Sequence, residues 1–289
     1  MGSFMQQLLS KRVATVADDR SIKDSNDLLA RLRDNGLLAF GEVIFDIQPD
    51  EFKEIKQLLP RMASDEVQRN WTGNCGLPLL MQSIDFVRTV STAYSTLTKN
   101  NVRDAKILDF GCGYGRIARL MYFFAEPTNV FGADPWDESI KICKSCGLGD
   151  NFKQSDYVPT ALPFGINFDF IYAFSVFTHL SEKTTRKCLS TLRKYVSTTG
   201  MLCITIRPIE YWSHHQPQDG RVADMISAHN DIGFAFQPHV REPLDGEITY
   251  GDTSMTPEWL TKNCPEWRVA GLDTSYFDQN QLYLYLMPA

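Results

Sequence analysis

The chain has 289 residues, of which 43% are hydrophobic and 22% charged, and its formal net charge is −6. This composition supports a full apolar core and fits one enlarged domain, or one domain with a small accessory region. The negative net charge, without any block of lysine and arginine, makes a nucleic-acid partner unlikely. No apolar run reaches the ~18 to 20 residues that cross a bilayer, so we expect no membrane span.

Cysteine usage points to a reducing compartment. The chain has seven cysteines, an odd number, and no basic-then-apolar leader, which predicts reduced thiols and a cytoplasmic protein. Cys143 and Cys146 form a C-x-x-C pair, but no second pair stands at zinc spacing, so we interpret them as helix packing. No other histidine, cysteine or carboxylate pattern has ligand spacing, and we expect no metal.

The first quarter of the chain reads as an accessory region. We expect a loose arm over 1–19, a helix over 25–35 and a second helix over 49–59. The apolar stretch 37–47 between the helices is either a strand pair or an irregular loop. Two short helices have no core of their own, so residues 1–76 are predicted to form a lid over the ligand-binding mouth of a main domain, residues 77–289.

Two features join the accessory region to the main domain. Residues 70–78 are rich in turn formers but carry Trp71, a side chain equally suited to anchoring the accessory helices and to touching a ligand. A long amphipathic helix is predicted over 79–97.

Residues 105–125 carry the most information. A short apolar run over 107–110 ends at alternating glycines, Gly111, Gly113 and Gly115, and apolar residues at helical spacing follow, so we predict a strand, a glycine turn and a helix. Glycines allow a sharp turn and a close approach of ligand to main chain, and the helix N-terminus favours anionic or polar groups. Arg116 stands three residues after Gly113, which breaks the G-x-G-x-x-G pattern and disfavours nicotinamide and flavin cofactors.

Further strands follow, each ending in polar residues. A strand over 129–134 ends in Asp134, and a carboxylate at such a place suits the two hydroxyls of a nucleoside ribose. Trp136 comes next and either stacks on adenine or belongs to the core. A third strand over 152–156 carries Ser155 and Asp156 at its tip. The nearly continuous apolar run 168–177 is typical of a central parallel strand.

The pattern D-x-G-x-G-x-G beginning at Asp109, with Asp134 and Asp156 in order after it, resembles the class I S-adenosylmethionine-dependent methyltransferases. The resemblance is close over 105–207 and looser afterwards. It implies S-adenosyl-L-methionine as cofactor and an α/β fold: a doubly wound, mostly parallel seven-stranded sheet, Rossmann-like, with a terminal antiparallel hairpin. It also implies that Asp109 and the glycines hold the methionine end and that Asp156, beside Ser155, faces adenine. Trp71, Trp136 and Ser175 complete the candidate cofactor contacts.

The remaining elements continue this order. Helices are predicted over 137–146, from an N-cap at Ser181 to Tyr195, and over 256–263. A fifth strand is predicted over 200–206, and a closing hairpin over 267–276 and 281–287. Residues 207–252 depart from a minimal methyltransferase and include two strand-like runs, 233–237 and 247–251. An insertion after the fifth strand overhangs the crevice at the strand carboxyl ends, so we interpret it as an acceptor-binding cap.

Methyl transfer from a sulfonium needs mainly an acceptor atom held in line. A hydroxyl acceptor also needs a base, and His179 in Ser175 to Leu180, SVFTHL, is either that base or a structural histidine of the turn. His214 and His215 are either surface residues or direct participants. A base with an ordinary pKa near ~6.5 predicts a rate that rises with pH through that region.

Two classes of function remain open at this point. The first is an enzyme that methylates a small polar acceptor, most simply a hydroxyl, with a sugar of a surface polysaccharide precursor suggested by the resemblance of SVFTHL and the terminal hairpin to methyltransferases of that kind. The second is a non-catalytic cofactor-binding protein of the same fold that regulates or scaffolds a partner. The chain could also form a homodimer.

Overall fold

The computed structural model describes residues 16, 22–47, 57–215 and 221–289. Apart from residue 16, the arm predicted over 1–19 lies outside the described residues, as does most of the helix predicted over 49–59.

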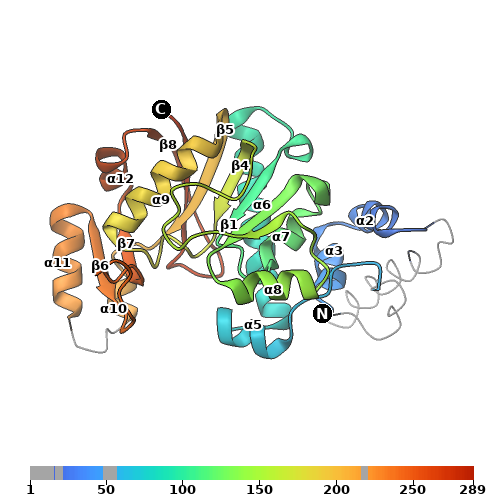
Figure 1. The fold of residues 1–289 in the computed structure, drawn as a ribbon, viewed down its shortest axis with the longest axis horizontal. Helices are drawn as coiled ribbons and strands as arrows, with labels where there is room; N and C mark the ends of the chain where they lie inside the picture. The colour runs from blue at the N-terminus through green and yellow to red at the C-terminus, as the bar shows by residue number, and fades with distance from the viewer. Residues whose placement is uncertain (1–15, 17–21, 48–56, 216–220) are drawn as a thin grey trace.

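A seven-stranded sheet forms the centre of the molecule, with strand order β3-β2-β1-β4-β5-β9-β8 (Figure 1). β1 to β5 pair in parallel, whereas β9 runs antiparallel to both β5 and β8. The predicted doubly wound, mostly parallel sheet with a terminal antiparallel hairpin is confirmed. Its strands are β1 (Ile107–Phe110), β2 (Val130–Asp134), β3 (Phe152–Gln154), β4 (Phe168–Ala173), β5 (Val196–Ile206), β8 (Trp267–Thr274) and β9 (Leu282–Pro288).

Helices cover both faces of the sheet and bury two apolar clusters, because successive strand residues point to opposite faces. In β1, for example, Ile107 joins one cluster and Leu108 the other. Within the described residues, no helix is both long and apolar enough to cross a membrane. The elements against the sheet or between its strands are α6 (Gly76–Thr98), η2 (Val102–Asp104), α7 (Arg116–Met121), η3 (Pro127–Asn129), α8 (Asp137–Ser145), α9 (Glu182–Tyr195) and α12 (Pro257–Asn263).

The stretch 37–47, expected as a strand pair or loop, contains the helix α3 (Leu37–Ile44), so that prediction was wrong. Gly36, at φ 88°, lets the chain turn sharply between α2 (Ser25–Arg33) and α3. α3 is buried on most of its surface, so its sequence lacks the polar face that marks an amphipathic helix. Gly41 allows close packing on α6, because a β-carbon there would lie only 2.7 Å from Leu80 Cδ1.

α2 does not lie over the glycine turn. Arg33 donates hydrogen bonds to the carbonyls of Tyr122 (2.9 Å) and Ala125 (3.0 Å), and pairs with Glu126 at 2.7 Å. These contacts hold α2 at the C-terminal end of α7, whereas the glycine turn precedes the N-terminal end of that helix. The expected placement of this helix over the cofactor mouth is therefore corrected.

The described residues also contain α5 (Asp65–Thr72), a helix that the sequence analysis did not predict and that takes in the first part of the turn-rich stretch 70–78. Ser64 caps its N-terminus, and Gly73, at φ 78°, ends it in the left-handed region. Trp71 therefore lies in the last turn of a helix and not in a loop.

The insertion after β5 gathers at one end of the molecule, opposite α2 and α3 (Figure 1). It contains α10 (Tyr211–His214), α11 (Val222–Ile232) and the antiparallel pair β6 (Phe234–Pro238) and β7 (Gly251–Met255). The second strand was predicted too early, at 247–251. β7 is fully buried but consists mostly of small and polar residues, so its sequence carries little apolar signal.

Candidate active site

Short hydrogen bonds fix the glycine turn at the end of β1. The backbone N–H groups of Gly111 and Cys112 donate to the carbonyl of Ala133 at 2.8 and 3.1 Å, and the N–H of Gly113 donates to Asp134 Oδ2 at 2.9 Å. Gly111, Gly113 and Gly115 have φ of 78°, 52° and 77°, a region that residues with side chains rarely adopt. The turn is thus a rigid stretch of bare main chain.

A cavity of about 380 Å³ opens against this turn. Its walls come from α5, α6, the glycine turn, the start of α7, the segment after β4, Tyr250 just before β7, and the loop between β8 and β9. It therefore lies at the carboxyl ends of the parallel strands. Of the predicted site residues, those that line it are Trp71, Asp109, Gly111, Gly113, Ser175 and His179, and those that do not are Gly115, Asp134, Trp136, Ser155, Asp156, His214 and His215.

Two buried, oppositely charged side chains meet this cavity. Asp109 is 2% exposed, and its Oδ2 has no hydrogen-bond partner. Burial raises the pKa of Asp109 to about 7, although Tyr172 and the charge of Arg116 lower it. Arg116 donates from Nη1 to Ser83 Oγ at 2.5 Å and to Gln82 Oε1 at 3.2 Å. A ligand with one ammonium and one carboxylate would complement this pair.

Arg116 was missed as a site residue at the sequence level. The sequence did hold a clue to Arg116, because it directly follows Gly115. A side chain at the start of this helix lies beside any ligand that the glycine turn binds.

Asp134 lies at the end of β2 and orders the turn. Oδ2 accepts the N–H of Gly113, and Oδ1 accepts the N–H of Trp136 at 3.0 Å. The side chain is largely buried, and burial raises its pKa. Ser139 also hydrogen-bonds this carboxylate, whose remaining acceptor capacity can still serve ligand hydroxyls.

Tryptophans from two distant segments cover the turn. The rings of Trp71 and Trp136 have centroids 4.6 Å apart with a 30° interplanar angle, and Trp71 Cε3 lies 3.9 Å from the place of a β-carbon on Gly113. No aromatic base fits between rings this close. An adenine bound at this turn would therefore have to stack on the outer face of Trp136, which is 45% exposed, or displace Trp71.

Ser155 and Asp156 follow β3 outside the cavity. Ser155 donates its N–H to the carbonyl of Asp134 at 3.0 Å, which places the pair beside the end of β2, and Asp156 is exposed.

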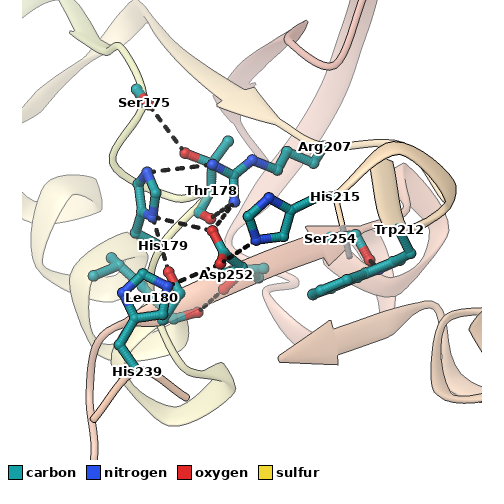
Figure 2. Close-up of polar contacts among 12 residues, drawn as sticks. Ser175, Thr178, His179, Leu180, Arg207, Trp212, His215, His239, Asp252 and Ser254 are labelled. Atoms are coloured by element: carbon teal, nitrogen blue, oxygen red, sulfur yellow. Dashed lines mark hydrogen bonds and ion pairs between the residues drawn. The ribbon is translucent and has the colours of Figure 1, made fainter. Parts of the chain in front are cut away.

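His179 lies where the segment after β4 pairs with β7 (Figure 2). Its carbonyl accepts the N–H of Gly251 at 2.8 Å, and its Nδ1 lies 2.8 Å from the carbonyl of Gly251, so Nδ1 carries the proton. Nε2 faces Arg207 Nη2 at 3.4 Å, and the ring stacks on Tyr250 with centroids 5.0 Å apart. Burial, followed by the charge of Arg207, lowers the pKa of His179 to about 4, and this corrects the ordinary value expected from the sequence.

The carboxylate of Asp252 joins the two ends of the insertion (Figure 2). Arg207 Nη1 contacts Oδ1 at 2.6 Å, and His239 Nε2 and His215 Nε2 contact Oδ2 at 2.8 and 3.1 Å. His214 points elsewhere, since its Nδ1 lies 2.9 Å from the carbonyl of Glu210. The structure therefore separates the two adjacent candidate histidines and brings in His239 and Asp252, which had not been singled out.

Groups of three or more histidine, cysteine or acidic side chains that could hold a metal ion are absent from the described part of the chain.

The strand order, the glycine turn and the cavity at the strand carboxyl ends define a class I methyltransferase fold. Residues 107–200 match the family described as the methyltransferase domain, in agreement with the resemblance found in the sequence. S-adenosyl-L-methionine, predicted from the sequence, is the cofactor of that class.

Solved structures agree on the fold. An S-adenosylmethionine-dependent methyltransferase from Clostridium acetobutylicum ATCC 824 aligns over 78% of this chain and 96% of its own, with 10% identity and a TM-score of 0.51. The glycopeptide N-methyltransferase MtfA aligns over 71% of this chain and 90% of its own, with 13% identity and a TM-score of 0.49. No curated protein is similar in sequence.

His179 gives a testable pH dependence. Its pKa of about 4 lies below the ordinary 6.5, so we expect it to stay neutral down to about pH 4 and to give no inflection in turnover near pH 6.5. The unfolded chain takes up this proton first, so the contribution of His179 to stability falls as pH drops from about 6.5 to about 4. Nuclear magnetic resonance of the imidazole C–H signals, assigned with His179→Gln, measures the midpoint. A midpoint near 6.5 would contradict the buried setting of the ring.

Proposed function

We propose that the protein binds S-adenosyl-L-methionine at the glycine turn and transfers its methyl group to a hydroxyl of a small polar acceptor. The observation that carries this proposal is the buried Asp109 and Arg116 pair beside the turn. Asp109 offers an unpartnered oxygen to an ammonium, and Arg116 offers a guanidinium to a carboxylate, which together match the amino-acid end of this cofactor.

The other candidate contacts follow from this orientation. With the methionine end at Asp109 and Arg116, the ribose hydroxyls reach the free lone pairs of Asp134, and adenine extends toward Trp136, Ser155 and Asp156. Trp71, from α5, then acts as the lid over the glycine turn.

The acceptor side of the cavity carries Ser175, His179 and Tyr250. Positioning an acceptor oxygen in line with the sulfonium methyl can contribute ~7 to 11 kcal/mol to lowering the barrier. His179 is the only histidine among the described residues that lines the cavity, so it is our proposed proton acceptor. Its Nε2 bears the lone pair but faces Arg207 Nη2 at 3.4 Å, so that contact must be released before Nε2 can take the proton of an acceptor hydroxyl. Because its pKa is low, the proton must leave the hydroxyl as the methyl arrives and not before.

Calorimetric titration with S-adenosylhomocysteine tests the cofactor assignment. Asp134→Ala should weaken binding by more than about tenfold, because two hydrogen bonds to a charged acceptor are worth ~1.5 to 3 kcal/mol each and the Gly113 N–H also loses its partner. Asp137→Ala removes a neighbouring exposed carboxylate and serves as the control. An unchanged dissociation constant in Asp134→Ala would remove the ribose assignment.

A further inference from the structure

The loop between β8 and β9, residues 275–281, is held in one conformation from within. The N–H groups of Phe277 and Asp278 donate to Ser275 Oγ at 3.1 and 3.2 Å, and the N–H of Asn280 donates to Asp278 Oδ1 at 3.0 Å. The N–H of Gln281 donates to the carbonyl of Asp278 at 2.9 Å. These bonds are typical of a preformed turn and not of an adaptable linker.

A buried carboxylate on α6 fixes this loop to the body of the domain. Asp85 is 1% exposed, and its Oδ2 accepts hydrogen bonds from Ser275 Oγ (3.1 Å), the N–H of Tyr276 (3.3 Å) and the hydroxyl of Tyr283 (3.1 Å). A buried carboxylate with three donors is costly to disturb. The side chains that the loop presents are therefore held in place before any ligand arrives.

The same loop contributes two polar side chains to the cavity wall and leaves two aromatic side chains exposed to solvent. Asp278 and Gln281 line the cavity. Gln281 is 6% exposed, its Nε2 lies 3.5 Å from Ser175 Oγ, and its buried Oε1 has no hydrogen-bond partner. In contrast, Tyr276 and Phe277 are 84% and 52% exposed. A buried, unpaired amide oxygen beside a cavity calls for a donor from a ligand.

The backbone conformation of Ser175 is a second feature typical of a ligand-binding site. It lines the cavity and has φ of 58°, unusual for a residue other than glycine, and its N–H donates to Thr205 Oγ1 at 2.7 Å. Strained backbone held in this way clusters at ligand sites.

We propose that Asp278, Gln281 and Ser175 form an acceptor subsite for a polyhydroxylated ring, a sugar or cyclitol, with Tyr276 and Phe277 as an apolar shelf at its rim. This inference rests on the proposed function, because it names the acceptor class for the same cavity. Ring hydroxyls supply the donors that Gln281 Oε1 and the remaining lone pairs of Asp278 require. The apolar C–H face of such a ring matches exposed aromatic side chains, which combine an apolar body with low conformational freedom.

The charges in the cavity favour a neutral acceptor. Asp278 repels an anionic group on this side, and Arg116 stands at the end assigned to the cofactor. Asp278 already accepts one N–H, so neutral hydroxyl donors are enough to complete its hydrogen bonds. A cationic acceptor is the competing chemistry, and the experiment separates the two.

Saturation-transfer nuclear magnetic resonance tests the subsite on the full-length protein, with and without S-adenosylhomocysteine. The probes are a mixture of glucose, galactose, mannose and N-acetylglucosamine, and separately 1,4-diaminobutane as a cation. We expect sugar signals with the unaltered protein, reduced by at least about fivefold in Gln281→Leu and in the double variant Tyr276→Ser/Phe277→Ser, which is the scale of one lost neutral hydrogen bond or ring contact.

Matched controls keep the test specific. Gln279→Leu removes an exposed amide of the same loop that does not line the cavity, and Tyr157→Ser removes a comparably exposed ring elsewhere. Both should retain the sugar signals, and thermal melts confirm that each variant is folded. Absence of sugar signals with the unaltered protein, a signal from the diamine instead, or equal signals in all variants overturns the subsite. The cofactor proposal is tested separately: it fails if calorimetry detects no binding of S-adenosylhomocysteine.

Discussion

Gly113→Val is expected to abolish measurable binding of S-adenosylhomocysteine while the domain remains folded. Gly113 has φ of 52°. For a residue with a β-carbon, this backbone conformation is less favourable by roughly 1 to 2 kcal/mol of free energy, and more so when the residue is β-branched. The new side chain would project toward Trp71, into the space in which we propose that the cofactor binds. A backbone shift would also disturb the 2.9 Å bond from Gly113 to Asp134. Together these effects predict a loss of at least about a hundredfold in affinity.

Gly149→Val is the matched control for this experiment. A β-carbon at Gly149 meets nothing within 4 Å, and its φ lies outside the left-handed region. Its affinity and melting temperature should therefore change little. If Gly113→Val is folded and binds the ligand as the unaltered protein does, the glycine turn does not hold the cofactor.

Local signals allowed most of the sheet to be predicted. β1, β2, β4 and β9 carry apolar runs that are largely buried, and Ser181 caps α9 by accepting the N–H of Thr184. These features depend on neighbours close in sequence, which is why a single sequence reveals them. α3 and β7 were not predictable in this way, because α3 lacks a polar face and β7 lacks an apolar run.

The sequence suggested site residues only where their place in a pattern, such as the end of a strand, indicates a role. The glycines and Asp134 meet this condition, but the partners of each side chain do not: the N–H of Gly113 and the carboxylate of Asp134 are 21 residues apart. His214 and His215 are adjacent in sequence, yet only His215 reaches Asp252. The low pKa of His179 results from its burial and from the charge of Arg207. Neither can be deduced from the spacing of residues in the sequence.

The largest effect on stability is expected at Asp252. Asp252 and Arg207 are 4% and 8% exposed, and Arg207 Nη1 also donates to the carbonyl of Thr178 at 2.8 Å. Asp252→Ala would leave the guanidinium buried without its counter-charge and would deprive His215 and His239 of their shared acceptor. Breaking a buried pair from one side costs about 3 to 5 kcal/mol, a large part of the ~5 to 15 kcal/mol that stabilises a typical domain.

Urea unfolding at several pH values measures this contribution and checks its sign. Burial alone would raise the pKa of Asp252, but the hydrogen bond from His239 and the charge of Arg207 outweigh it and hold that pKa below its usual range. A group with a depressed folded pKa contributes stability above its unfolded pKa, here near 3.8, and loses it as pH falls further. The difference between the unaltered protein and Asp252→Ala should therefore be full at pH 7 and shrink below about pH 4.

The double variant Arg207→Met/Asp252→Leu separates a lost ion pair from a stranded charge. Replacing both partners with apolar side chains removes the uncompensated guanidinium, so it should destabilise the fold less than Asp252→Ala does. If the double variant is instead the less stable of the two, Arg207 stabilises the cap mainly through Thr178 and the ring of Tyr211, 4.0 Å from its guanidinium carbon, and the pairing with Asp252 is secondary.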